Sequence, residues 1–170
     1  MKNEVLLLGN PILRLVSDCV IFPLDEKTKL EIAMLHEALE EFRCKVGFGR
    51  GIAAPQIGIS KRIIALNLKN KLYTVINPNV VFSSNDKFFI WDDCMSFPDL
   101  LVKVERHKSI SMVFLDENGE KIVWENLPTD VSELMQHEID HLDGILAVDR
   151  VVDKFGLIYK SELNKATQNS

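Results

Sequence analysis

Two histidines four residues apart, with a glutamate between them, are the residues of this sequence best suited to chemistry. His137, Glu138 and His141 lie in a segment whose apolar residues recur at helical spacing. In a helix, positions four apart lie one above the other on the same face, so both imidazoles can bind one metal ion. Glu138 lies one position further round and can reach a metal-bound water as general acid and base. The spacing therefore predicts a metal site on a helix.

A solvated helix face can also carry two histidines by chance, as ordinary polar residues. The whole sequence contains four histidines, however, and two of them bracket this glutamate. We therefore favour a metal site over an incidental pair.

A catalytic metal of this kind needs a third protein ligand and one open position. No histidine or cysteine follows His141, and Glu162, the one glutamate that does, lies in a polar segment with little to fix its position. Cys94 lies upstream among turn residues and beside two acids, where a packing cysteine is unusual. Because a thiolate suits a divalent transition metal, Cys94 is the favoured ligand. An endopeptidase that uses Glu162 instead is the alternative.

The chain length, cysteine count and net charge indicate one globular domain spanning residues 1–170. A chain of 170 residues can bury a core without disulfides, and three widely spaced cysteines are typical of a reducing compartment. A net charge of −5 without a basic patch argues against DNA as a partner. The first residues carry only a four-residue apolar run, too short for a signal peptide, and no segment has the length of a membrane span. We therefore expect a cytoplasmic protein of bacterial type, with no membrane partner.

The order of helical and strand-like segments predicts an α+β fold, with mostly antiparallel β-sheets around a central metal-binding helix. Residues 25–45 have an apolar stripe of helical period. The metal-motif helix is expected to begin at Thr129 or Asp130 as N-cap and to end at Gly144. Asn70 and Asn77-Pro78 are expected turns. Strands are expected at residues 62–68, 72–76, 80–82, 88–91, 100–105, 109–115 and 121–124, with a last extended piece at 145–152 and a weakly ordered tail at 160–170.

A glycine-rich stretch precedes the first predicted strand, with glycine at positions 47, 49 and 51. Such glycines in an extended segment let a ligand or another backbone approach closely, although a flexible loop would have the same composition. The stretch lacks the Lys-Ser/Thr ending of a phosphate loop, which excludes that kind of nucleotide site. Ala53, Ala54 and Gln56 follow, and predict a tight wall beside a site.

Three motifs resemble those of the peptide deformylases and occur in that family's order. They are Gly49-x-Gly51-x-Ala53-Ala54-Pro55-Gln56, Cys94-Met95-Ser96 and Gln136-His137-Glu138-Ile139-Asp140-His141-Leu142-Asp143-Gly144. The early Gly9-Asn10-Pro11-Ile12-Leu13 is similar too, so the resemblance covers roughly residues 4–152. It implies an enzyme that removes the N-formyl group from formyl-methionine at the start of nascent polypeptides, near the ribosome and as a monomer.

The resemblance also implies roles for individual residues. Cys94, His137 and His141 would hold one divalent metal, most often iron(II) in this family, with nickel, cobalt or zinc as substitutes. Glu138 would take a proton from the metal-bound water and give it to the leaving amine. The side-chain amide of Gln56, with the backbone N–H of Met95, would stabilise the oxyanion.

Four further positions would contact the substrate, since a glycine-rich edge can pair with an extended peptide. These substrate-binding positions are Gly49, Arg50, Gly51 and Asp93.

The second motif departs from the usual Glu-Gly-Cys-Leu-Ser, because this chain has Asp92-Asp93-Cys94-Met95-Ser96. Asp92 keeps a carboxylate and is expected to pair with Arg106, which would support the cysteine loop. Asp93 adds a charge beside the metal thiolate on a segment that approaches the substrate. It is the one feature that supports a homologue acting on another N-acyl group or only binding peptides. The intact Glu138 and Gln56 argue against that alternative.

Two further departures concern charge near the predicted cleft. Arg50 stands where an uncharged side chain is common, and we expect it to form an ion pair with Asp93, within about 4 Å. Glu133 lies one turn before His137 and is expected to point to solvent, as lone helix acids usually do. If it faced the cleft instead, it would alter the preference for substrate side chains.

Overall fold

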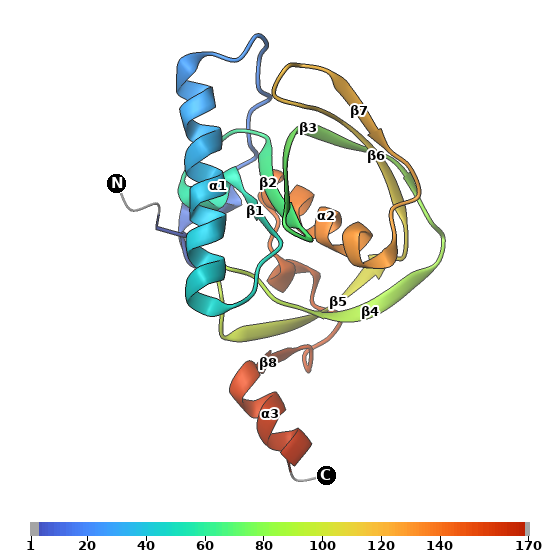
Figure 1. Cartoon of the computed structure of the whole chain (residues 1–170). Coiled ribbons are helices and arrows are strands. Elements are labelled where there is room, and N and C mark those ends of the chain that lie inside the picture. The colour runs from blue at the N-terminus through green and yellow to red at the C-terminus, as the bar shows by residue number, and fades with distance from the viewer. Residues whose placement is uncertain (1–3, 169–170) are drawn as a thin grey trace.

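Helix α2 (Thr129–Leu142) lies at the centre of the fold, with strands of two antiparallel sheets around it (Figure 1). The structure is a computed structural model that describes residues 4–168. The larger sheet has the order β1-β2-β3-β6-β7 and the smaller one β4-β5-β8. The predicted α+β class with antiparallel sheets is confirmed. The strands are β1 (Gly51–Ala53), β2 (Ile63–Leu68), β3 (Lys71–Ser83), β4 (Lys87–Asp92), β5 (Leu100–His107), β6 (Ile110–Leu115), β7 (Lys121–Trp124) and β8 (Leu157–Tyr159).

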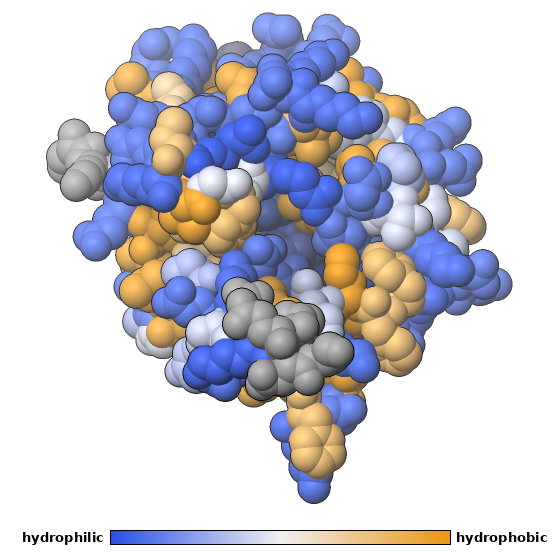
Figure 2. Space-filling model, turned by 60° about the horizontal axis from the view of Figure 1, so that its bottom comes forward, coloured by the Kyte–Doolittle hydropathy of each residue, from blue (hydrophilic) through white to orange (hydrophobic). Residues whose placement is uncertain are grey.

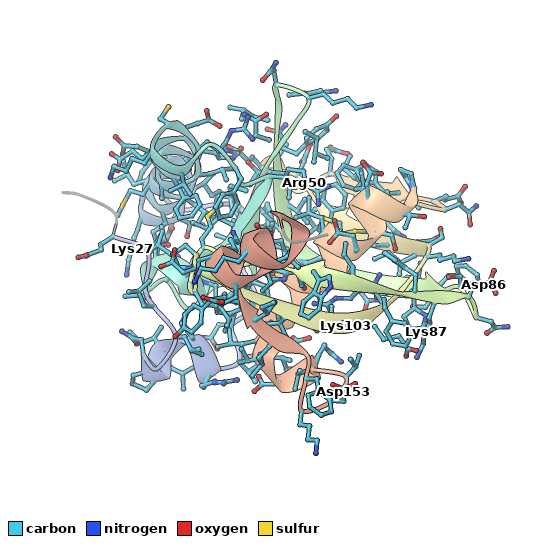
Figure 3. The ribbon with its side chains drawn as sticks, turned by 90° about the horizontal axis from the view of Figure 1, so that it is seen from below. Lys27, Arg50, Asp86, Lys87, Lys103 and Asp153 are labelled. Atoms are coloured by element: carbon cyan, nitrogen blue, oxygen red, sulfur yellow. The ribbon has the colours of Figure 1, made fainter. Side chains whose placement is uncertain are left out.

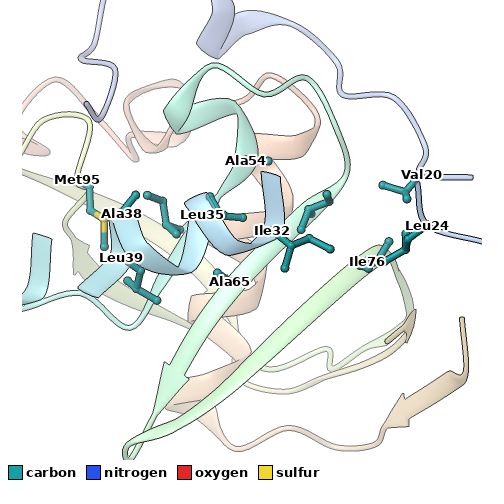
Figure 4. Packing of buried hydrophobic residues seen from close by; sticks show 12 residues of the cluster. Val20, Leu24, Ile32, Leu35, Ala38, Leu39, Ala54, Ala65, Ile76 and Met95 are labelled. Carbon is teal, nitrogen blue, oxygen red and sulfur yellow. The ribbon is translucent and has the colours of Figure 1, made fainter. Parts of the chain in front are cut away.

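Helix α1 (Glu26–Val46) covers one side of the larger sheet, as its apolar stripe predicts. Asp25 caps it by accepting a hydrogen bond from the backbone N–H of Thr28 at 2.7 Å. Its buried face, with Leu35 and Leu39, packs on β2 and on the 3₁₀ helix Ala54–Ile57 (Figure 4). The far end of this contact is Met95, so the packing of α1 reaches the segment that carries Cys94.

Helix α2 is buried on most of its surface, because one face packs on the larger sheet and another faces the metal-ligand cluster. Pro128, rather than Thr129 or Asp130, is the N-cap, so the predicted start was wrong by one or two residues. The Pro128 carbonyl already accepts from Val131 and Ser132, which closes the first turn without a side-chain cap. The predicted end at Gly144 is confirmed, with a φ of +71°.

Three segments differ from the expectation. The predicted turn at Asn77-Pro78 is a bulge inside the continuous strand β3, where Asn77 has a φ of +50° and its side chain binds the backbone of Val20. The extended piece predicted at 145–152 contains a 3₁₀ turn (Ala147–Arg150), and its N-cap residue Leu146 donates its backbone N–H to the Asp149 side chain. The expected tail forms helix α3 (Lys160–Gln168) up to residue 168, and residues 169–170 lie outside the described part.

A short 3₁₀ turn (Pro11–Arg14) precedes α1, and its carbonyl at Arg14 packs directly against Gly144. A Cβ on Gly144 would lie 2.5 Å from that oxygen, so only glycine fits there. Within residues 4–168, no helix combines the length and apolar character needed to cross a membrane.

Candidate metal centre and active site

Three potential ligands meet between helix α2 and the loop that follows β4. The ligand atoms of Cys94, His137 and His141 all lie within 4.8 Å of one another, and all three residues are buried. The Cys94 Sγ lies 3.3 Å from the His141 Nε2. One thiolate and two imidazoles that converge in this way fit a divalent transition metal, with room for a further ligand. These three residues therefore form a candidate metal site, at the positions that the sequence predicts.

The orientation of His137 is fixed from behind the cluster. Its Nδ1 donates to the Asp92 Oδ2 at 2.9 Å, which leaves Nε2 directed to the ligand cluster. Arg106 donates from Nη2 to the same carboxylate oxygen at 3.0 Å, so the predicted Asp92–Arg106 pair is confirmed. Burial opposes ionisation of Asp92, but the charges of His137 and Arg106 outweigh it and lower the pKa of this carboxyl to about 2.

The two histidines differ in their electrostatic surroundings. Burial would lower the pKa of His137, but the charge and hydrogen bond of Asp92 raise it well above the ordinary value. Within residues 4–168 no carboxylate bonds the His141 Nδ1, so burial and the neighbouring His137 lower the pKa of His141. A neutral His141 has a free lone pair, which is the form a metal requires.

Glu138 is buried beside this cluster and lines the cleft. Among the described residues its Oε2 has no hydrogen-bond partner, which is costly for a buried carboxylate unless a ligand or water completes the site. Burial raises its pKa to about 7, while the charge of His137 acts in the opposite direction. A Cβ on Gly51 would lie 2.9 Å from the Glu138 Oε1, so any larger residue there would displace this carboxylate.

Gln56 lies on the other side of the cluster, where the 3₁₀ helix after β1 places it. Its Oε1 accepts from the backbone N–H of Ala53 at 2.9 Å. This bond turns the Nε2 toward the Ser96 Oγ at 3.2 Å and the Cys94 Sγ at 3.5 Å. The amide group is therefore held with its donor toward the metal-ligand cluster, and Met95 lines the same cleft directly after Cys94.

The cluster lies in a cleft of about 460 Å³. Figure 2 shows a hollow near the centre of the face turned forward, with many hydrophilic residues around it. Edge strand β1 borders the cleft on one side and edge strand β4 on the other. The four predicted substrate-binding positions all line it. The cleft is lined by Arg43, Gly47, Phe48, Gly49, Arg50, Gly51, Gln56, Ile90, Trp91, Asp92, Asp93, Cys94, Met95, Glu133, Leu134, His137 and Glu138.

The predicted ion pair between Arg50 and Asp93 was wrong. Arg50 pairs with Glu133 and donates to the backbone oxygen of Asp130 at 2.8 Å, while Asp93 pairs with Lys160 at 3.2 Å. The prediction that Glu133 points to solvent was also wrong, since this residue is only 7% exposed. It lies on the same helix face as His137, and that face is turned to the cleft rather than to water.

Two residues of the site were not predicted. Asp140 is buried behind the cluster, where it accepts from Arg106 at 2.6 Å and from Arg150 at 2.6 and 2.7 Å. A carboxylate between the two histidines, on the side of the helix away from the metal, was the available signal. Lys160 lies at the cleft mouth, where its Nζ is 4.0 Å from the centre of the Phe48 ring. No local pattern indicates that contact.

Glu162, the alternative third ligand, lies outside the cluster. It is on helix α3, half exposed, and its carboxylate pairs with Lys165 at 2.6 Å. The ligand set with Cys94 is therefore the one that the fold brings together.

A cysteine, two histidines and an adjacent buried glutamate, at the bottom of a cleft between two sheet edges, define a metal-dependent hydrolase of peptide-like substrates. A family model described as polypeptide deformylase matches residues 2–155. The chain belongs to the peptide deformylase family, and it is thus a metal-dependent enzyme that removes the N-formyl group from formyl-methionine at the start of polypeptides.

Known relatives cover almost the whole chain. A peptide deformylase of Thermotoga neapolitana is 33% identical over 160 residues, which is 94% of this chain and 93% of the relative. The crystal structure of peptide deformylase from Thermotoga maritima has a TM-score of 0.79 at 32% identity, covering 88% of this chain and 97% of that one. The structure of a Plasmodium falciparum peptide deformylase in complex with an inhibitor has a TM-score of 0.78 at 32% identity, covering 97% of this chain and 95% of that one.

Proposed function

We propose that Glu138 is the general acid and base of formyl-methionine hydrolysis in this chain, with Cys94, His137 and His141 as the metal ligands. The observation that carries this assignment is the buried Glu138 Oε2, which has no partner among the described residues and lies beside three converging ligand atoms. A buried carboxylate in that position needs a proton donor such as the attacking water.

Iron(II) is the native metal we propose, with nickel, cobalt or zinc as functional substitutes. One thiolate and two imidazoles suit all four ions, so the preference for iron rests on the resemblance to the family. An ion held there supplies Lewis-acid polarisation of the formyl carbonyl and lowers the pKa of a bound water.

The protein residues then account for the proton and the developing charge. Glu138 accepts a proton from the water as its oxygen bonds to the formyl carbon. It returns that proton to the nitrogen as the C–N bond breaks, which gives formate and a free amine. A pKa of about 7 suits both transfers near neutral pH. The Gln56 Nε2 and the backbone N–H of Met95 donate to the carbonyl oxygen as it becomes negative.

The peptide binds as an extended strand between β1 and β4 in this proposal. Both strands are sheet edges on the cleft, and edge strands present unpaired backbone groups. Gly49 and Gly51 let the substrate backbone approach β1. The substrate is a nascent chain, so we place the enzyme in the cytoplasm near the ribosome, as a single domain and as a monomer. The carboxylate of Asp93 is paired with Lys160, which leaves action on another N-acyl group without a supporting observation.

The experiment is formate release from formyl-Met-Ala-Ser by protein purified without oxygen and loaded with iron(II) or nickel(II). Glu138→Gln should lower kcat/KM by about 10²–10⁴-fold while one metal per chain remains bound. Glu162→Gln is the matched control at an exposed glutamate and should match the parent. Cys94→Ala should lose the metal. A Glu138→Gln protein with parental activity, or a Cys94→Ala protein that keeps its metal, would overturn the assignment.

A further inference from the structure

One wall of the cleft carries an ion pair rather than apolar side chains. Arg50, just before β1, donates to the Glu133 Oε1 and to the backbone oxygen of Asp130 on α2. The Glu133 side chain is 9% exposed and that of Arg50 is 42% exposed. Glu133 is thus the buried acidic member of the pair, and Arg50 is the cationic member that faces the cleft. Arg50 is labelled in Figure 3.

This pair lies where the side chain of the formylated residue has to go. Along α2 the cleft is lined by Glu133, Leu134, His137 and Glu138, and by none of the described residues after Glu138. A substrate side chain that starts beside His137 and Glu138 therefore runs toward the N-terminal end of α2. Glu133 is four residues before His137, about 6 Å along the helix axis. A side chain as long as methionine covers that distance, so its tip reaches the ion pair.

The guanidinium of Arg50 has donors left for a ligand. A guanidinium carries five N–H donors, and among the described residues Arg50 has two acceptors, Asp130 and Glu133. In the open cleft, water satisfies the remaining donors. A wholly apolar side chain that displaces this water leaves donors unpaired, whereas a side chain with an acceptor at its tip satisfies them.

We propose that the Arg50–Glu133 pair makes the cleft select N-formyl peptides whose first side chain ends in a hydrogen-bond acceptor. This inference rests on the deformylase function proposed above and concerns its substrate class. The sulfoxide oxygen of oxidised methionine is a strong acceptor, the thioether of methionine a weak one, and norleucine has none. The enzyme therefore accepts chains that begin with formyl-methionine sulfoxide, and it binds norleucine peptides least well.

The informative variant replaces both members of the pair by leucine. Replacing Arg50 alone would leave Glu133 as an uncompensated buried charge, whereas exchanging both partners for apolar residues is often neutral or stabilising. Arg50→Leu/Glu133→Leu also leaves the net charge unchanged. The matched control is Lys87→Met/Glu105→Gln, which removes an exposed ion pair of 3.1 Å that lies away from the cleft.

Affinity is measured without turnover, by calorimetry on Ni(II)-loaded Glu138→Gln protein. The ligands are formyl-X-Ala-Ser peptides with methionine sulfoxide, methionine or norleucine at X. The pair variant should change the ratio of the norleucine and sulfoxide Kd values by about 10–100-fold in favour of norleucine, the cost of one or two unpaired buried donors. The control pair should leave this ratio within about twofold. In proteins that keep Glu138, the kcat/KM for formate release should rank the three peptides in the same order as their affinities.

The outcomes separate this proposal from the function on which it rests. Peptides that bind with the same ratio in the pair variant and its parent overturn the selectivity and leave deformylation intact. Absence of binding by all three peptides overturns both. Where circular dichroism shows that the leucine variant is unfolded, the same ratio is measured for Arg50→Met/Glu133→Gln, which removes the guanidinium donors and keeps the length of the Glu133 side chain.

Discussion

Helix α2 separates two sets of charged residues, one buried behind the metal ligands and one half exposed at the cleft. Behind the ligands, Asp92, Arg106 and Asp140 form a continuous chain of ion pairs that ends at the surface with Arg150. We call these four residues the rear network. The side chain of Arg106 is 3% exposed, and each carboxylate of the chain is at most 10% exposed. The network bonds His137 directly.

At the cleft, the ion pairs Arg50–Glu133 and Lys160–Asp93 each have at least one substantially exposed member. We call these the cleft-mouth pairs. They contact no metal ligand by a hydrogen bond within the described residues. Arg50, Glu133 and Asp93 line the cleft, and Lys160 is bonded to Asp93.

The difference in burial indicates different roles. A buried charge that loses its partner is strongly destabilising, so the rear network holds the geometry of His137 in a way that tolerates little change. The exposed Lys160–Asp93 pair contributes little to stability, whereas Arg50 compensates the buried charge of Glu133, so the Arg50–Glu133 pair can change only as a unit. In the assignment proposed above, the rear network orients His137, and the cleft-mouth pairs contact the substrate.

The largest expected effect comes from breaking the rear network at its centre. Arg106→Ala leaves Asp92 and Asp140 without their shared cation, and should lower the free energy of unfolding by about 3–5 kcal/mol. Urea unfolding at pH 7 measures this. Lys160→Ala is the comparison at the cleft mouth and should cost less than about 1 kcal/mol. Equal losses in the two variants would contradict the difference in role.

The pH dependence of stability should report the same network. In the metal-free protein the pKa of Asp92 is lowered from 3.8 to about 2. Because the folded pKa lies below the unfolded value, this carboxylate stabilises the fold fully above a pH of about 4, and that contribution is lost as the pH falls through 2. The difference is on the order of 2 kcal/mol. Urea unfolding between pH 5 and pH 2 should show Asp92→Asn losing less stability than the parent, and parallel curves would refute this.

Two neighbouring aspartates allow a sharper comparison. Asp92→Asn removes the carboxylate behind His137 and should weaken metal affinity by about 10–100-fold. Asp93→Asn changes the next residue in the same way, but its carboxylate belongs to a cleft-mouth pair, so metal affinity should stay within about twofold. Competition with a chelator of known affinity measures both. Similar losses at the two positions would mean that charge near the thiolate matters more than the bond to His137.

The smallest expected effect is at Lys160, which contacts both lips of the cleft through Asp93 and Phe48. Lys160→Met should raise KM by up to about fivefold with little change in kcat, since a surface pair and a cation–π contact each contribute about 1 kcal/mol or less. Lys160→Arg should restore the parental KM. Raised salt should reduce the difference between parent and Lys160→Met. A fall in kcat alone would assign Lys160 to the chemical step.

Local sequence predicted most of the fold and the reactive centre. Helix α1 and strands β2 to β7 follow from periodicity, whereas the three-residue strands β1 and β8 were not predicted. His137, Glu138 and His141 follow from the spacing of residue types on one helix. The bulge at Asn77 could not be predicted, because its side chain binds Val20, far away in the sequence. For the same reason the partners of Arg50 and Asp93 were assigned wrongly. Both lie at the cleft, but which charge each one faces depends on how α2 and α3 are placed.

The two sheet edges that border the cleft have a consequence for timing. A chain that pairs with β1 and β4 together has to be extended, and free of backbone bonds on both of its own sides. A chain start already folded into a helix or buried in a sheet does not meet that condition. Removal of the formyl group therefore competes with folding of the substrate's own N-terminus, and a protein whose first residues fold quickly has the shortest interval in which to be processed.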